Sequence, residues 1–158
     1  MRIVEIEQKF ADKDTLVEVI LDLEEEFDKV DEYASKMKAN EFDNPEAVKR
    51  GLNELTGVYS NLKTVLSLAE IEKKNREVRK FNAVKRAIEE DPKYDSKGKL
   101  LNKFVAASGD KEAREYVNEY SRVRNLIDGY TDACHKMMST LQSLLKYMVV
   151  DWHNTQGE

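Results

Sequence analysis

Apolar residues recur every three or four positions through three segments of the chain. In the first segment the steps alternate between four and three, at Leu16, Ile20, Leu23, Phe27, Val30, Ala34 and Met37. This spacing places them on one stripe of an α-helix, the kind of seam that packs in a coiled coil. The first residues, Ile3-Val4-Glu5-Ile6, could form a short extended arm or a frayed turn. We therefore expect an acidic N-terminal arm and helix over residues 1–43.

A second, long helix with a basic second half is predicted over residues 44–91. Asn44 can cap its start, Pro45 suits the first helical position, and no proline follows until Pro92. Its first half has a seam at Leu52, Leu55, Tyr59, Leu62, Leu66 and Ala69. The same register would next bring Lys73, Arg76 and Lys80 onto the seam, whereas the apolar residues move to Ile71, Val78, Phe81, Val84 and Ile88. This shift predicts a stutter, after which a different face of the helix is buried.

The C-terminal helix, predicted over residues 110–150, has the longest seam. Its apolar positions are Ala113, Tyr116, Tyr120, Val123, Ile127, Tyr130, Cys134, Met137, Leu141, Leu144 and Met148. Residues 92–109 are predicted to form a basic loop, with Ser108 or Asp110 capping the helix that follows. Residues 151–158 are predicted to be a loose tail. The fold class is therefore all-α, with three long helices and heptad seams in a coiled coil or helical bundle.

The long helices favour self-association. Three narrow seams bury limited area within one chain, and burial is more complete if protomers associate through the extended helices. We therefore expect a homo-oligomer. The residues expected to drive its assembly lie on the C-terminal seam, at Tyr120, Ile127, Cys134, Leu141 and Leu144.

Composition and the rarest residue types narrow the function classes. Charged residues make up 36 % of the chain, and it has only two prolines, which is typical of long helices. No signal peptide or membrane span is expected, and Cys134 as the single cysteine fits a reducing cytoplasm. There are only two histidines, no metal-ligand spacing and no glycine-rich phosphate loop. We therefore expect no metal, no cofactor and no enzymatic activity.

The net charge of −5 conceals a strong asymmetry. Residues 1–45 carry 6 basic and 14 acidic side chains, a net of −8, and residues 73–103 carry 11 basic and 5 acidic, a net of +6. Basic residues with interleaved aromatics suit single-stranded nucleic acid, because cations follow the phosphates and flat rings stack on bases. Tyr94 and Phe104 are the candidate stacking residues. The candidate nucleic-acid-binding cations are Lys73, Lys74, Arg76, Arg79, Lys80, Lys85, Arg86, Lys97, Lys99 and Lys103.

The same charges have a second explanation. The acidic N-terminal segment and the basic middle could simply pair, within a protomer or between protomers. Both arrangements can coexist, since an acidic arm on the basic surface would compete with nucleic acid and lower non-specific affinity. Deletion of residues 1–40 would then increase binding.

Two stretches of the chain form a recognisable pattern. Leu66–Arg86, with the sequence LSLAEIEKKNREVRKFNAVKR, is a basic helix before a polar loop, and Val105–Met148, which opens VAASGDKEAREYVNEY, is a long C-terminal helix. Together they resemble the UvsY-like recombination mediators of myovirus-type phages. The resemblance implies a non-catalytic accessory that binds single-stranded DNA as a ring-like oligomer. It also implies two protein partners, a strand-exchange recombinase and a single-strand-binding protein. By position it assigns DNA contact to the cations of 73–86 and assembly to the C-terminal helix. The acidic first helix is not part of the family pattern.

Two other functions fit the sequence. The chain could be a structural coiled-coil adaptor or assembly chaperone whose partner is another protein helix. It could also be an inhibitor whose acidic helix, with carboxylates from Glu18 to Glu32, mimics DNA toward a nuclease or repair enzyme. The charge-reversed middle of the chain speaks against the inhibitor.

Overall fold

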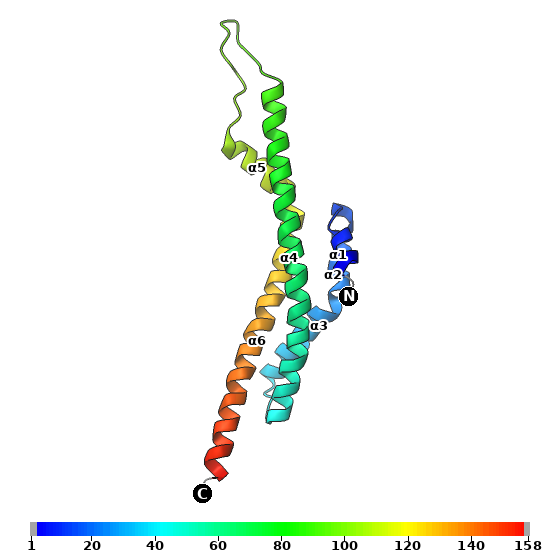
Figure 1. Ribbon diagram of the computed structural model, residues 1–158, viewed down its shortest axis with the longest axis vertical. Helices are drawn as coiled ribbons and strands as arrows, with labels where there is room; N and C mark the ends of the chain where they lie inside the picture. The colour runs from blue at the N-terminus through cyan, green and yellow to red at the C-terminus, as the bar shows by residue number, and fades with distance from the viewer. Residues whose placement is uncertain (1–2, 157–158) are drawn as a thin grey trace.

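The computed structural model describes residues 3–156, and within this range the chain is all-α, as predicted. Figure 1 shows an elongated molecule in which two long helices form the axis. The elements in chain order are α1 (Ile3–Lys9), the short 3-10 helix η1 (Lys13–Thr15), α2 (Leu16–Asp22), α3 (Glu24–Lys38), α4 (Pro45–Glu90), α5 (Ala106–Tyr116) and α6 (Asn118–Gln156). The extreme ends of the predicted arm and tail, residues 1–2 and 157–158, lie outside the described residues.

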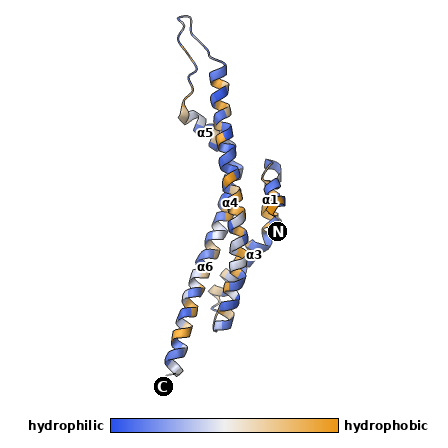
Figure 2. Cartoon of the chain, viewed as in Figure 1, coloured by the Kyte–Doolittle hydropathy of each residue, from blue (hydrophilic) through white to orange (hydrophobic). Residues whose placement is uncertain are grey.

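The two long helices α4 and α6 run antiparallel and bury their seams against each other (Figure 1). α4 begins where the sequence predicts, with the Asn44 side chain accepting a hydrogen bond from the Ala47 amide at 2.9 Å. It continues for 46 residues without a break, which is about 69 Å of helix. The predicted seam residues at the centre of this contact are buried: Leu55, Leu62, Leu66 and Ala69 on α4, and Ile127, Cys134 and Leu141 on α6. Figure 2 shows hydrophobic and hydrophilic residues interspersed along both helices, as expected for helices with one buried face.

The predicted first helix is divided, so the expectation of one helix from Thr15 to Met37 is wrong. α2 and α3 are separated at Leu23, whose backbone leaves the helical region at φ −99° and ψ 3° while its side chain is fully buried. The bend lets α2 pack beside α1 while α3 lies against α4 and α6. In the α3–α6 contact the Phe27 and Tyr130 rings stack with centroids 4.2 Å apart. Ile3–Lys9 form α1, so the residues expected to be an extended arm or a frayed turn are helical.

The second half of α4 does not show the change of buried face that the sequence predicts. Ile71 and Val78 were expected to be buried and are 56 % and 50 % exposed. Lys73, Arg76 and Lys80, which continue the original register, are instead half-buried on the inner side. Of the predicted second stripe, Phe81, Val84 and Ile88 are half-buried near the far end of the helix.

Two tyrosines explain why cations can occupy the inner side of α4. The Arg76 guanidinium lies 4.6 Å from the centre of the Tyr120 ring, and the Lys80 ammonium lies 5.4 Å from the centre of the Tyr116 ring. An aromatic face attracts a cation and also covers its apolar stem. The seam register therefore continues with cation–aromatic contacts in place of apolar ones.

The predicted last helix is also divided. α5 begins at Ala106, after Val105, so neither Ser108 nor Asp110 is the cap, and both lie inside the helix. The break at Val117 shifts the register by one residue, since Val117 is buried and the predicted seam residue Tyr116 is 51 % exposed. α6 then continues to Gln156, so residues 151–156 are helical rather than a loose tail.

Candidate nucleic-acid interface

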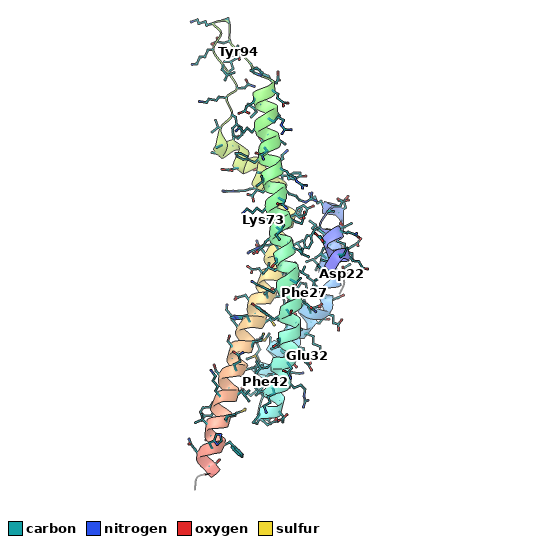
Figure 3. The ribbon with its side chains drawn as sticks, in the orientation of Figure 1. Asp22, Phe27, Glu32, Phe42, Lys73 and Tyr94 are labelled. Carbon is teal, nitrogen blue, oxygen red and sulfur yellow. The ribbon has the colours of Figure 1, made fainter. Side chains whose placement is uncertain are left out.

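The candidate cations lie on an arm formed by the second half of α4, the loop of residues 91–105 and α5. In Figure 3, Lys73 lies near the middle of α4 and Tyr94 lies at the far end of the arm. α5 packs back against α4, where the Phe81 and Phe104 rings meet edge to face at 5.4 Å. Gly109 permits this contact, because a β-carbon there would lie 2.8 Å from the Phe104 ring.

The far end of the arm is an ordered turn within this loop, which we call the hairpin (residues 93–101). Tyr94 and Leu100 form an antiparallel bridge, and the Leu101 amide donates to the Lys93 carbonyl at 2.6 Å. At the tip, one Asp95 carboxylate oxygen accepts hydrogen bonds from the amides of Lys97 and Lys99 at 2.8 and 2.9 Å. Gly98 supplies the positive φ of 77° that the turn requires. The hairpin therefore holds its lysines on a defined backbone.

Four of the candidate cations on α4 are exposed: Lys74, Arg79, Lys85 and Arg86. Lys85 and Arg86 each lie 4.0 Å from a glutamate one turn further along α4, at Glu89 and Glu90. Exposed pairs at this distance contribute little free energy, so both cations can exchange the carboxylate for a phosphate.

Arg76 is held by the N-terminal segment. Its Nη2 donates to the Phe10 carbonyl at 3.1 Å and also to the Ala11 carbonyl, and its side chain is only 18 % exposed. The ring of Tyr120 covers its other side. Arg76 is therefore engaged in an intramolecular contact, and we leave it out of the proposed interface.

Lys73 and Lys80 are also less available for a phosphate than the sequence suggests. The Lys80 ammonium lies over the Tyr116 ring. Lys73 lines a shallow hollow of about 480 Å³ together with Lys74, Arg124 and the carboxylates of Glu70 and Glu77. Arg124 donates to Glu70 at 2.7 Å across this hollow. The two carboxylates weaken the attraction of the hollow for a phosphate.

The candidate residues of the hairpin and its flank are exposed. Lys97, Lys99 and Lys103 face solvent, and Tyr94 is 59 % exposed, so its ring can accept a base. Phe104, the other predicted stacking residue, is half-buried against Phe81 and serves packing instead.

The predicted pairing of the acidic arm with the basic middle takes a specific form. The contact at Arg76 is made by two backbone carbonyls of the N-terminal segment rather than by its carboxylates. Within that segment Lys9 pairs with Asp22 at 2.5 Å, and hydrogen bonds from Lys36 and Lys29 lower the pKa of Glu32 to about 2. Asp22 and Glu32 are therefore paired with lysines of their own segment rather than with the basic middle of the chain.

The five predicted assembly residues lie mostly inside the protomer. Tyr120, Ile127, Cys134 and Leu141 are at most 3 % exposed, and Leu144 is half-buried. Their seam packs on α4 of the same chain, so we do not expect it to lie between protomers. Self-association itself stays a prediction.

Sequence reasoning missed two features of the arm. One is the hairpin, whose signal was the spacing of Asp95 and Gly98, a turn-forming carboxylate followed by a residue that tolerates positive φ. The other is the group of apolar side chains exposed beside the lysines, with Leu100 at 42 %, Leu101 at 63 % and Val105 at 57 %.

No protein-family model, curated protein or solved structure matches the chain. None of the helices in residues 3–156 combines the length and apolar character that crossing a bilayer requires. In the same residues, no three side chains of the metal-ligating types His, Cys, Asp and Glu converge.

Cys134 is expected to be unreactive in the folded chain. Burial raises the pKa of its thiol from 9.0 to about 11, and the thiol donates to the Leu55 carbonyl at 3.3 Å. Because the thiolate is the reactive form, a disulfide reagent at pH 8 should modify Cys134 only after denaturant is added. The thiol loses its proton at a lower pH in the unfolded chain than in the folded chain. The free energy of unfolding should therefore fall as pH rises from about 9 toward 11. Rapid modification of the native chain at pH 8 would contradict this burial.

Proposed function

We propose that the chain is a non-catalytic accessory protein of DNA recombination or repair that binds single-stranded DNA and acts as a homo-oligomer. The observation that carries this proposal is the arm, which presents exposed cations along α4 and on the hairpin with an exposed tyrosine among them. The resemblance to UvsY-like mediators supports it, and a recombinase and a single-strand-binding protein are the proposed protein partners. The antiparallel α4–α6 seam would be an intramolecular coiled coil that carries the arm.

The chemistry of the arm fits binding of single-stranded DNA without recognition of its base sequence. Arginine and lysine bind phosphates without regard to the base, and a tyrosine ring stacks on any base. The Arg79 and Arg86 side chains lie two helical turns apart, about 10.5 Å along α4. They can therefore contact separate phosphates of one strand.

Fluorescence anisotropy with a labelled single-stranded oligonucleotide tests the proposal. We expect the affinity to fall steeply with salt, and the double variant Arg79→Glu/Arg86→Glu to bind at least about tenfold more weakly. Losing two phosphate contacts should also make the slope of log affinity against log salt concentration less steep by about 1.4. The matched control is Lys49→Glu/Lys63→Glu, which makes the same charge change on the other half of α4 and should change neither quantity.

Absence of salt-dependent binding at low ionic strength would overturn the proposal, as would an equal loss in the control variant. The second candidate would then be favoured, a helical adaptor or chaperone that binds a protein. The apolar side chains exposed on the hairpin beside its lysines are the observation that supports this alternative.

A further inference from the structure

The hairpin exposes apolar and basic side chains together at the end of the arm. Tyr94, Leu100 and Leu101 are between 42 % and 63 % exposed, and Lys97 and Lys99 face solvent beside them. The hydrogen bonds to Asp95 fix the turn, so these groups form a surface of defined shape. A fixed apolar patch rimmed by charge marks a site for a protein partner.

A second surface of the chain has the opposite charge. The bend between α2 and α3 forms a hollow of about 430 Å³, which we call the acidic hollow, and one lysine and an exposed leucine also line it. Its lining residues are Leu21, Asp22, Glu24, Glu25, Asp28, Lys29 and Glu32. Leu21 is 61 % exposed, and Val17, one turn earlier on α2, is 66 % exposed. This surface therefore also combines apolar side chains with charge.

The two surfaces are complementary in charge as well as in apolar character. Residues 17–32 carry 8 acidic side chains and 1 basic, a net of −7, whereas residues 93–103 carry 4 basic and 1 acidic, a net of +3. They lie far apart in one chain, because the hairpin is at the far end of the arm and Asp22 lies on the N-terminal segment beside the middle of α4 (Figure 3). One chain cannot bring them together without detaching its own core.

We propose that the hairpin of one copy docks in the acidic hollow of a second copy. Leu100 and Leu101 would cover the exposed Leu21 and Val17, while Lys97 and Lys99 meet the glutamates. The inference rests on the homo-oligomer of the proposed function and assigns its interface. In the assembly this contact occupies Lys97 and Lys99, and the exposed cations of α4 bind the DNA. This interface replaces the C-terminal seam as the expected site of assembly, because the seam packs on α4 of the same chain.

A contact between two different surfaces is heterologous. Each copy offers one hairpin and one hollow, so assembly proceeds head to tail into a closed ring or an open filament. A hairpin tip buries less area than a standard interface, so a single contact is weak and sensitive to salt. Closure of a ring strengthens it, because the last contact forms within one particle.

A charge swap tests the proposal in the absence of nucleic acid, with the full chain and with mass measured by sedimentation and light scattering over a concentration series. The hairpin variant is Lys97→Glu/Lys99→Glu, and the hollow variant is Glu24→Lys/Glu25→Lys. In the hairpin variant the introduced glutamates face the acidic hollow, and in the hollow variant the introduced lysines face Lys97 and Lys99, so the assembly of each variant alone should weaken at least tenfold. An equal mixture should regain assembly, because the unaltered hairpin of one variant meets the unaltered hollow of the other, and the introduced glutamates meet the introduced lysines.

The control is again Lys49→Glu/Lys63→Glu, which lies outside both surfaces and should assemble like the unaltered chain. Recovery in the mixture shows that both variants are folded, and circular dichroism checks each alone. A monomeric unaltered chain at all concentrations, normal assembly of either single variant or no recovery in the mixture would overturn the proposal. DNA binding is measured separately through Arg79 and Arg86, so failure here and failure of the proposed function are distinguishable.

Discussion

Ile127→Asp is expected to unfold the chain rather than to dissociate an oligomer. Ile127 is fully buried at the centre of the α4–α6 contact, and within residues 3–156 no buried side chain carries a charge that could pair with a new carboxylate. The substitution loses the burial of the side chain and places a charge in an apolar environment. We expect the free energy of unfolding to fall by more than about 4 kcal/mol. Urea denaturation followed by circular dichroism measures this loss.

The matched control is the neighbouring residue. Leu126 is 42 % exposed, so Leu126→Asp makes the same kind of change on the solvent side of α6 and should cost less than about 1 kcal/mol. If Ile127→Asp remained folded while its particle mass decreased, the C-terminal seam would lie between protomers. The assignment of the seam to the protomer core would then be wrong.

Arg76→Ala is expected to detach the N-terminal segment from α4. The guanidinium holds the carbonyls of Phe10 and Ala11, and its loss leaves both without their charged donor next to the buried Phe10 side chain. Hydrogen bonds from a charged group contribute about 1.5–3 kcal/mol each, so we expect losing both to cost at least about 3 kcal/mol. Hydrogen exchange should show faster exchange over residues 3–22, with α6 less affected.

Arg79→Ala is the control, since Arg79 is exposed one turn further along the same helix. It should change stability by less than about 0.5 kcal/mol but reduce the salt dependence of DNA binding. Arg76→Ala could instead reduce the salt dependence of DNA binding as much as Arg79→Ala does and leave the hydrogen exchange of residues 3–22 unchanged. That result would assign Arg76 to the DNA contact.

Hydrophobic periodicity was sufficient to predict which side chains are buried along most of the fold. The seam of α4 from Leu55 to Ala69 and that of α6 from Ile127 to Leu141 are both buried. The pattern could not show the interruptions at Leu23 and Val117, because a one-residue break keeps apolar side chains at nearly the same spacing. It also could not distinguish a seam that packs within the chain from one that packs between chains.

The candidate site was predicted less well because a cation in a sequence carries no record of its neighbours. Arg76 and Arg79 lie only about 60° apart on a helical wheel, yet one is bound by carbonyls 65 and 66 residues away and the other faces solvent. Phe104 and Tyr94 differ in the same way, since Gly109 gives Phe104 a place against α5. Contacts between residues distant in sequence decide which charged and aromatic groups remain free to bind.

The order of α4 and α6 along the chain has a consequence for biosynthesis. Leu55 on α4 makes its buried contact with Cys134, 79 residues later, so the α4 seam leaves the ribosome well before its partner. At about 5–20 residues per second this interval lasts roughly 4–16 s. During that time the leucines of α4 are covered by the N-terminal helices alone. The nascent chain therefore depends on α3 to protect α4 from aggregation until α6 has been synthesised.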